Sequence, residues 1–550
     1  MNKYIKNTFL SGMAVALFAC TSCSDTWDDH YDTNSSGMAA QKSIWEAISS
    51  DEQLKDFREV IERVGRTDLL KSDQMYTVWA PVNDSFNKDS IISLIENGQT
   101  LDVIKRFVNN HITRSAYSNM RLAQSVNMLN KKRCDIDGTG YISDAKIVSL
   151  DPLKCNNGLL YTVHGELPFR NNIFEALEVN EDFSKIYEFF YRYEEDSLDE
   201  GKSVSRGVDE NGNKIWVDSV IISNNPLFNS LSAIINVEDS NYWALLPHND
   251  AFEKRLEETL PYFDFHPSVE NRDSLQQLYA TRYMLSDCFF NMNDNKYYEE
   301  GDSLASTTYS KREPLYDVFH HPFYTRNDTV GILENYTEEI TCSNGTLYGF
   351  DEWPFSIYDS FFRRMKIECE RSGNIETSST YMKNAQYQGY YTNTDSISNG
   401  FLDVVPTSSA VNPTMTFKIP NTLAGEYDIY VVAVPKSAMS IYNTDYRPYK
   451  FRASIIERDP DDDKGAKWIS EPLNDNKEIT NNPYVMDTLY VGTHKFNHCY
   501  YAQPEVGVML QLTSFIRSAE TSEYSREMLL DFILLKPHRE TESDSIDIDE

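Results

Sequence analysis

The chain has 550 residues and a mass of 63.5 kDa, more than one hydrophobic core normally organises, so several domains are expected. Hydrophobic residues make up 40% and aromatic residues 13%, which excludes a disordered chain. The formal net charge of −34 would repel phosphate backbones, so nucleic acid is not expected as a partner.

The first residues predict export from the cytoplasm. Lys3 and Lys6 precede an apolar run over residues 9–19 that is too short to span a bilayer, as in the charged and apolar regions of a secretory signal. The run ends in Cys20-Thr21-Ser22-Cys23, which resembles the lipobox of bacterial lipoproteins. We therefore expect residues 1–22 to be a lipoprotein signal peptide and Cys23 to carry the lipid, with Cys20 as the alternative.

The segment after Cys23 predicts how the protein is held. Its sequence Cys-Ser-Asp-Thr-Trp-Asp-Asp is similar to the acidic export tag of surface lipoproteins in some Gram-negative bacteria. Residues 23–40 are rich in Asp, Ser, Asn and Gly and predict a flexible leash. No other hydrophobic run approaches the length of a membrane span. The predicted location is the cell surface at the outer membrane, with the lipid as the only anchor.

A self-comparison of the sequence reveals an internal repeat. Residues 76–86, YTVWAPVNDSF, recur at 242–252 as YWALLPHNDAF. Downstream, residues 157–161, NGLLY, recur at 344–348 as NGTLY. Because order and content both repeat, we expect two copies of one module, the second with about 21 extra residues in surface loops.

The repeated motifs predict local structure. Residues 76–80 form a short buried strand that Pro81 ends, because proline cannot donate to a strand ladder. Asn83 and Asp84 are predicted to cap a helix that starts near Ser85. The Asn-Gly pair is a turn signal that feeds a strand over residues 159–163.

The pattern also predicts which side chains are buried. Leu101, Ile104, Val108 and Ile112 have the spacing of one helical face. Six large residues at equivalent places in the two copies are expected to be structural: Trp79, Phe86 and Tyr161, with Leu245, Phe252 and Tyr348. If Phe86 is buried, truncation to Ala would cost about 3–5 kcal/mol.

The motif YTVWAPVNDSF, followed by FVNNHI at residues 107–112 and then NGLLY, resembles a fasciclin (FAS1) domain. The resemblance covers residues 41–171 and, more weakly, residues 172–365. It implies two α/β domains, each a seven-stranded β-wedge flanked by helices, and a role in extracellular adhesion. Some members carry a Tyr-His pair implicated in adhesion where this chain has Asn110-His111 and, in the second copy, residues 283–288. His111 is accordingly interpreted as a hydrogen-bonded structural residue.

The last third of the chain has a different pattern. Residues 415–419 and 427–434 alternate between apolar and polar, and residues 528–535 form an expected closing strand. Turn signals divide the rest into short segments, so residues 366–540 predict an all-β, jelly-roll-like sandwich. The pattern weakly resembles carbohydrate-binding modules. Residues 541–550 are expected to be a disordered acidic tail.

Two groups of tyrosines in this last region suggest a sugar platform, because aromatic faces stack on sugar rings. We select Tyr387, Tyr390 and Tyr446 as candidate ligand-binding residues. The alternative is that these rings belong to the sheets and rims, since 35 tyrosines must be placed somewhere. Residues 366–540 are expected to fold alone and to bind oligosaccharide weakly if the first interpretation holds.

No enzyme signature motif occurs, and the ten histidines show no metal-ligand spacing, so neither catalytic residues nor a metal or cofactor is predicted. The acidic loop at residues 459–465 suggests either a calcium site or a solvated hairpin tip, with the hairpin favoured because EF-hand spacing is absent. Cys134 and Cys155 are the best candidates for a disulfide, against buried thiols for all six remaining cysteines, which also include Cys288, Cys342, Cys369 and Cys499.

Three functions remain open from sequence. The first is adhesion to an extracellular protein or matrix through the fasciclin-like modules. The second is glycan capture by the C-terminal sandwich in a polysaccharide-uptake system. The third is hydrolysis by an unrecognised pair of carboxylates. A non-catalytic binding function is the expectation, with the partner and the oligomeric state unspecified.

Overall fold

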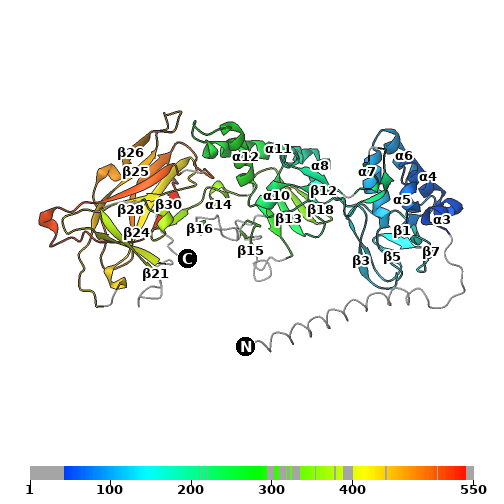
Figure 1. Ribbon diagram of the computed structural model, residues 1–550, viewed down its shortest axis with the longest axis horizontal. Helices are drawn as coiled ribbons and strands as arrows, with labels where there is room; N and C mark the ends of the chain where they lie inside the picture. Colours follow the sequence, from blue (N-terminus) through cyan, green and yellow to red (C-terminus); the bar gives the residue numbers. More distant parts are fainter. Residues whose placement is uncertain are drawn as a thin grey trace, which may run out of the picture. The chain divides into compact units, whose positions relative to one another are not determined.

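A computed structural model describes residues 42–539 except 211, 220, 294–302, 309–316, 319–322, 325–332, 334, 354, 377–379, 388–399, 440–441 and 504–505. The predicted signal, the leash, Cys20, Cys23 and the tail lie outside the described residues. The chain divides into two compact units, one of residues up to 169 with 204–218, the other of residues 170–203 with 219 onward (Figure 1). Among the described residues, every helix falls short of the length and hydrophobicity that a membrane span requires.

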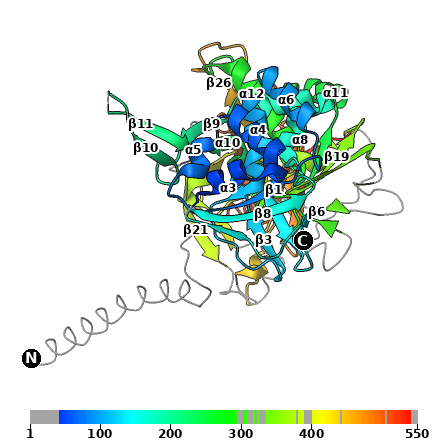
Figure 2. The ribbon, with the colours of Figure 1, turned by 90° about the vertical axis from the view of Figure 1, so that its right-hand side faces the viewer.

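In the first unit, helices gather on one side of a mixed sheet (Figure 2). The helices are α3 (Ile44–Ser50), α4 (Lys55–Arg63), α5 (Thr67–Lys71), α6 (Lys88–Glu96) and α7 (Thr100–Arg106). The strands are β1 (Tyr76–Pro81), β2 (Ile112–Thr113), β3 (Gln124–Asn127), β4 (Arg133–Ile136), β5 (Tyr141–Ile142), β6 (Ala145–Ile147), β7 (Leu153–Cys155) and β8 (Gly158–His164). The order is β2-β1-β8-β6-β5-β4-β3, with β7 on β8, so this sheet has eight strands rather than seven.

The two motif strands lie together at the centre of this sheet. β1 pairs in parallel with β8, Tyr76 opposite Gly158 and Trp79 opposite Tyr161. Every residue of β1 is buried, since one hydrophobic cluster covers each face of the sheet there. The indole of Trp79 stacks on the ring of Tyr161 with centroids 6.0 Å apart. Both predicted strands and the burial of these two side chains are confirmed.

The predicted helix start near Ser85 is wrong. Helix α6 begins at Lys88, and Asn87 caps it by accepting from the Ser90 N–H at 3.1 Å. The Asn83 side chain instead accepts from the Asp56 N–H, 2.9 Å away in helix α4, and donates to the Glu52 carbonyl at 2.7 Å. Asn83 therefore ties a distant helix to the end of β1, which local sequence signals do not reveal.

The predicted helical face at residues 101–112 is partly wrong. Helix α7 ends at Arg106, and Ile112 begins a strand. Ile104, Val108 and Ile112 are buried, but Leu101 is 80% exposed, so the four residues do not share one helical face. Phe86 is only partly buried, 5.1 Å from the ring of Phe107, so its truncation should cost less than full burial would imply.

The second unit opens with the same order of elements as the first. It contains helices α8 (Ile173–Val179), α9 (Ser184–Tyr191), α10 (Pro226–Leu231), α11 (Asn249–Thr259) and α12 (Arg272–Met284). Its sheet has the order β14-β13-β19-β18, from β13 (Tyr242–Pro247), β14 (Phe289–Asn291), β18 (Glu338–Cys342) and β19 (Gly345–Phe350). β13 pairs in parallel with β19, Tyr242 opposite Gly345 and Leu245 opposite Tyr348, the register of the first unit. Leu245, Phe252 and Tyr348 are buried, as predicted.

Two β-ribbons separate α9 from α10, whereas only three residues separate α4 from α5. The ribbons pair β9 (Glu195–Leu198) with β12 (Ile221–Asn224), and β10 (Val204–Val208) with β11 (Lys214–Asp218). The second ribbon groups with the first unit, where Arg206 Nη1 donates to Asp68 Oδ2 at 2.6 Å. This insertion was not predicted from the sequence.

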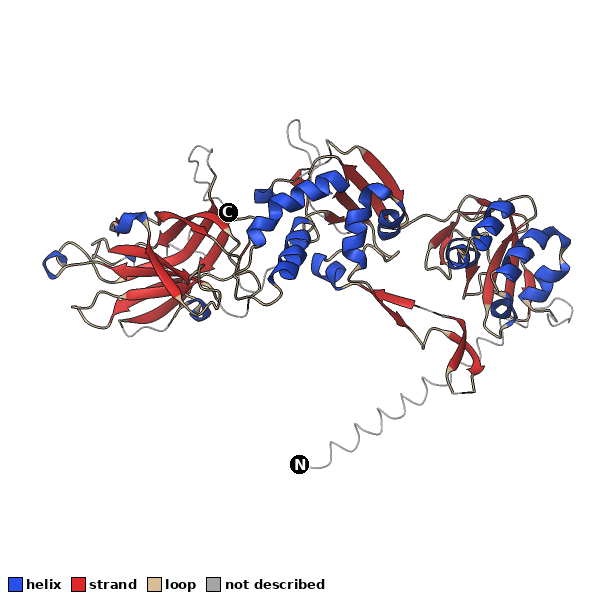
Figure 3. Ribbon diagram, turned by 90° about the horizontal axis from the view of Figure 1, so that it is seen from above, coloured by secondary structure: helices blue, strands red, loops and turns tan. Residues whose placement is uncertain are grey.

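In the rest of the second unit, most of the regular elements are strands (Figure 3). One antiparallel sheet contains β16 (Asp317–Val318), β20 (Met365–Glu368), β21 (Tyr381–Tyr387), β22 (Gly400–Pro406), β24 (Gly425–Ala433), β28 (Asp487–Phe496) and β30 (Met528–Pro537). The other contains β23 (Thr414–Lys418), β25 (Lys450–Arg458), β26 (Trp468–Pro472), β27 (Ile479–Thr480) and β29 (Val508–Ser514). The predicted strands at 415–419, 427–434 and 528–535 are present. We call residues 365–539 the sandwich region.

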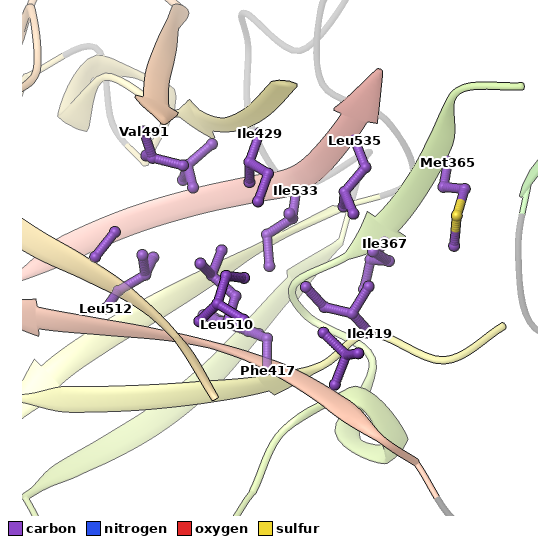
Figure 4. Packing of buried hydrophobic residues seen from close by; sticks show 14 of the residues in the cluster. Met365, Ile367, Phe417, Ile419, Ile429, Val491, Leu510, Leu512, Ile533 and Leu535 are labelled. Atoms are coloured by element: carbon purple, nitrogen blue, oxygen red, sulfur yellow. The ribbon is translucent and has the colours of Figure 1, made fainter. Parts of the chain in front are cut away.

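The two sheets of the sandwich region pack over one core (Figure 4). Ile429 and Ile533 of the first sheet lie opposite Phe417 and Leu510 of the second. The same cluster includes Phe263, Phe265, Ala280 and Phe362, all from before residue 365. The core of the sandwich region therefore extends into the helical layer of α11 and α12, so residues 366–540 alone would expose apolar surface that those helices cover.

Candidate functional site

The sequence repeat corresponds to a repeated set of buried hydrogen bonds. Asn157 Oδ1 accepts from the Ile44 N–H at 2.8 Å, and its Nδ2 donates to the carbonyls of Leu70 and Ser72, both at 2.9 Å. Because Asn157 is 4% exposed, its amide holds the start of α3 and the end of α5 against β1. The predicted turn role of this asparagine is therefore only part of what it does.

The second unit repeats this arrangement. Asn344 Oδ1 accepts from the Ile173 N–H at 2.9 Å, and its Nδ2 donates to the carbonyls of Ile235 and Val237 at 2.8 and 3.0 Å. Asn249, at the position of Asn83, accepts from the Lys185 N–H at 3.0 Å and donates to the Glu181 carbonyl at 2.8 Å. The same set of hydrogen bonds therefore recurs at equivalent places in the two units.

His111 is a structural residue, as predicted. It is fully buried, its Nδ1 lies 2.7 Å from the Phe107 carbonyl, and its Nε2 accepts from the Leu167 N–H at 3.0 Å. This pattern requires the neutral ring with its proton on Nδ1, since Nε2 is an acceptor. Burial lowers the pKa of His111 to about 4, against the opposing effect of the Phe107 carbonyl.

The lowered pKa of His111 predicts acid sensitivity of the first unit. The unfolded histidine takes up a proton near pH 6.5 and the folded one only near pH 4, so its contribution is intact above pH 6.5 and falls between pH 6.5 and 4. The expected loss is about 3 kcal/mol. Urea titrations from pH 7 to 4 should show a shallower pH dependence in His111→Asn, whereas replacing the exposed His164 with Gln should change nothing. Equal slopes in wild type and His111→Asn would contradict this.

In the second unit the equivalent positions have a different chemistry. By strand register, Asp287 and Cys288 stand where the first unit has Asn110 and His111. The Asp287 carboxylate is 1% exposed and pairs with Arg363 Nη2 at 2.7 Å. Hydroxyls of Ser306 and Thr308 also donate to it, at 2.7 and 3.1 Å. A buried ion pair thus joins the second module to the segment that leads into the sandwich region.

Of the three candidate ligand-binding tyrosines, the structure describes the side chain of one. Tyr390 lies outside the described residues, and Tyr387 ends β21 with its side chain not described. Tyr446 is 40% exposed and stacks on Tyr484, which is 66% exposed, with ring centroids 5.1 Å apart. Tyr484 was not among the predicted residues, because the loop that contains it is distant from Tyr446 in the chain. Binding by these residues stays a prediction.

Ion pairs hold the loop that carries Tyr446. The Asp445 carboxylate accepts from Arg447 Nε at 2.8 Å and from Lys436 Nζ at 2.9 Å, and Lys436 also pairs with Glu527 at 2.6 Å. Arg447, followed by Lys436, holds the pKa of Asp445 well below its usual range. These ion pairs hold the loop that carries Tyr446 in one conformation. Less conformational entropy is therefore lost when a ligand stacks on the exposed Tyr446–Tyr484 pair.

A groove of about 980 Å³ runs between the helical layer and the sandwich region. Its volume is that of a ligand pocket. Gly425 has φ +145°, and a Cβ there would lie 2.7 Å from Phe362, so the glycine lets that ring form part of the lining. Tyr262 and Tyr358 contact Phe362 with ring centroids 4.7 and 6.0 Å apart. We call this the aromatic groove.

Polar groups line the aromatic groove beside its rings. Glu258 pairs with Arg255 at 3.3 Å, and Asp264 pairs with Arg272. Further polar lining groups are Glu257, Gln276, Glu426, Lys495, Asn497 and His538. This lining suits a ligand with apolar faces and many hydroxyls. The aromatic rings can stack on the apolar faces, and the carboxylates and amides can form hydrogen bonds with the hydroxyls.

The loop at residues 459–465 is the tip of the β25–β26 hairpin, as favoured from sequence. There Asp462 accepts from the Ala466 and Lys467 N–H groups at 2.8 and 2.9 Å, which lowers its pKa. Within the described part of the chain, no three His, Cys, Asp or Glu side chains gather as metal ligands would.

The suggested disulfide between Cys134 and Cys155 is not formed; both are buried thiols, as are the other four cysteines. They pack on different sides of the sheet, Cys155 with the helices and Cys134 with the opposite cluster, which keeps them apart. Burial raises the pKa of Cys155 to about 11, so it is not a reactive thiolate at neutral pH.

Comparison with known proteins identifies one segment. Residues 52–167 match the Fasciclin domain family. No curated protein matches the chain. Among solved structures, a FAS1 domain pair from the insect cell adhesion molecule Fasciclin I is 15% identical, over 56% of this chain and 98% of that chain, with a TM-score of 0.20.

Two further solved structures are similar over shorter shares. A Paenibacillus xanthan lyase is 12% identical over 36% of this chain and 16% of that chain, with a TM-score of 0.20. An exo-β-1,3-galactanase from Phanerochaete chrysosporium is 12% identical over 31% of this chain and 28% of that chain, with a TM-score of 0.15. The family match is confined to residues 52–167.

Proposed function

We propose that this chain is a non-catalytic, lipid-anchored cell-surface protein that binds an extracellular protein or matrix component through two fasciclin-like modules. The observation that carries the proposal is the Fasciclin domain match at residues 52–167, because domains of this family occur in cell adhesion proteins. The repeated framework of Asn157 and Asn344 supports a second module of the same kind over residues 172–365.

The anchoring part of the proposal comes from residues 1–40. The short apolar run before Cys23 and the acidic segment after it fit export and lipidation at the outer membrane. Cells grown with radioactive palmitate should label the wild-type chain and should not label Cys23→Ala. Label that persists in Cys23→Ala but is lost in Cys20→Ala would move the anchor, and label absent from the wild type would refute lipidation.

A second candidate function, glycan capture, has its own support in the second unit. The aromatic groove and the Tyr446–Tyr484 pair both offer rings, and the groove adds carboxylates and amides. In this account the partner is an oligosaccharide and the fasciclin-like modules are spacers. Stacking is modest per ring, so the dissociation constant would be in the millimolar to micromolar range, about −4 to −8 kcal/mol.

One experiment separates the two functions. Residues 24–550 are applied to immobilised collagen, laminin and fibronectin and, in parallel, to an array of neutral oligosaccharides. Adhesion predicts saturable binding to a matrix protein that Tyr262→Ala and Tyr446→Ala leave unchanged. Glycan capture predicts binding to an oligosaccharide that Tyr262→Ala or Tyr446→Ala weakens about tenfold or more, while Tyr141→Ala, an exposed tyrosine of the first unit, does not. Silence on both surfaces would refute both functions.

A further inference from the structure

A second, smaller cavity lies between α12 and the sandwich region, and nothing in the proposed function uses it. Its volume is about 110 Å³. An apolar cavity of roughly 150 Å³ in another protein holds a benzene molecule, so this smaller cavity has room only for an organic molecule smaller than benzene. The size excludes an oligosaccharide or a peptide.

One part of the cavity lining is apolar. Leu231, Phe263, Met365 and Leu423 contribute to it, and each is at least nine-tenths buried. They come from α10, the turn after α11, the start of β20 and the turn before β24. This lining favours a ligand with an aromatic or aliphatic body, because apolar area removed from water stabilises the complex.

The rest of the lining is positively charged. Three arginines contribute, Arg282, Arg363 and Arg364, and no carboxylate does among the described residues. Asp287 neutralises Arg363. No ion pair holds Arg282 within the described part of the chain; its guanidinium lies 5.3 Å from the ring centre of Tyr283. The lining therefore carries more positive than negative charge, although the chain as a whole has a net charge of −34. Such a local excess of positive charge indicates an anionic ligand.

A buried hydroxyl in the same lining lacks a partner. The Ser360 side chain is 4% exposed, and its Oγ makes no hydrogen bond in the described structure. Buried polar atoms nearly always have a partner, because leaving one without it is unfavourable. Ser360 thus points independently to a ligand with a hydrogen-bond acceptor.

We propose that this cavity binds a small organic monoanion, a carboxylic acid in its ionised form with a short aliphatic body that is smaller than a benzene ring. The carboxylate would interact with Arg282 and accept from Ser360 Oγ, and the body would pack against Phe263 and Leu423. Because the lining comes from both the helical layer and the sandwich region, the bound anion would also stabilise the junction between them.

Equilibrium dialysis with residues 24–550 tests this proposal using propionate and its neutral analogue propionamide. We expect propionate to bind about tenfold or more tightly than propionamide, because only propionate gains the charge-assisted interaction. Arg282→Gln should remove this preference and Arg282→Lys should retain it, while Arg121→Gln in the first unit should have no effect. Ser360→Leu, which fills the cavity, should abolish binding of both compounds.

Circular dichroism of each variant separates loss of binding from loss of folding, and the wild-type comparison of the two compounds needs no variant. Absence of propionate binding, equal binding of propionamide, or a preference that survives Arg282→Gln would each overturn the proposal. The assay uses neither matrix proteins nor oligosaccharides, so its outcome is independent of the proposed function.

Discussion

Gly158→Ala is expected to prevent folding of the first unit. Gly158 has φ +145°, and a Cβ there would lie 1.9 Å from the Tyr76 carbonyl oxygen of the paired strand. Since that oxygen belongs to the backbone of a fully buried strand, neither side can move without separating β1 from β8. Hydrogen exchange of residues 24–550, followed by mass spectrometry, should show lost protection over residues 42–169 and retained protection over residues 400–537.

The same change in the second unit gives a matched test. Gly345 has φ +142°, and a Cβ there would lie 1.8 Å from the Tyr242 carbonyl oxygen, so Gly345→Ala should remove protection around β13 and β19. Gly98→Ala is the control, because φ there is +85° but no atom lies within 4 Å of the added Cβ. It should cost only about 1–3 kcal/mol, the strain of the backbone conformation. Normal protection in Gly158→Ala or Gly345→Ala would contradict the shared architecture.

Arg363→Met is expected to destabilise the second unit by about 3–5 kcal/mol. The substitution leaves the Asp287 carboxylate, 1% exposed, with only the hydroxyls of Ser306 and Thr308 and a weaker contact from Ser286. An uncompensated buried charge is the reason for so large an effect. Urea unfolding should show the loss, and hydrogen exchange should place it in peptides around residues 284–290 and 363–368.

The control for this experiment is an exposed ion pair. Arg121 pairs with Asp151 at 3.1 Å, with side chains 56% and 80% exposed, so Arg121→Met should change the stability by about 0–1 kcal/mol. Asp287→Asn combined with Arg363→Met should recover part of the loss, since no charge is then buried. If Arg363→Met is no more harmful than Arg121→Met, the ion pair does not hold the junction.

The sequence was most informative where structure is local. Pro81 ends β1 as expected, the Asn157-Gly158 turn feeds β8, and alternation correctly predicted β23 and β24. In each case the signal and the structure it specifies lie within about ten residues. The repeat also allowed a prediction beyond local structure. Two copies of one motif are expected to fold alike, even where the residues that pack against each copy are unknown.

Long-range contacts could not be predicted. Asn83 caps a helix 27 residues earlier, and Arg363 pairs with an aspartate 76 residues away, neither of which has a sequence signature. The aromatic groove brings Tyr262 and Tyr358 together with Glu426 and His538, so no window of sequence contains it. Tyr484 was not predicted as a ligand-binding residue for the same reason, since its stacking partner Tyr446 lies on another loop.

The central claim is that this protein binds an extracellular partner without transforming it. The most direct measurement incubates residues 24–550 with the matrix proteins and oligosaccharides of the binding experiment, measures saturable binding, and then determines the mass of each recovered partner by mass spectrometry. The account predicts saturable binding of at least one partner and unchanged masses throughout. Shortened oligosaccharides, cleaved matrix protein, or no binding to any partner would contradict it.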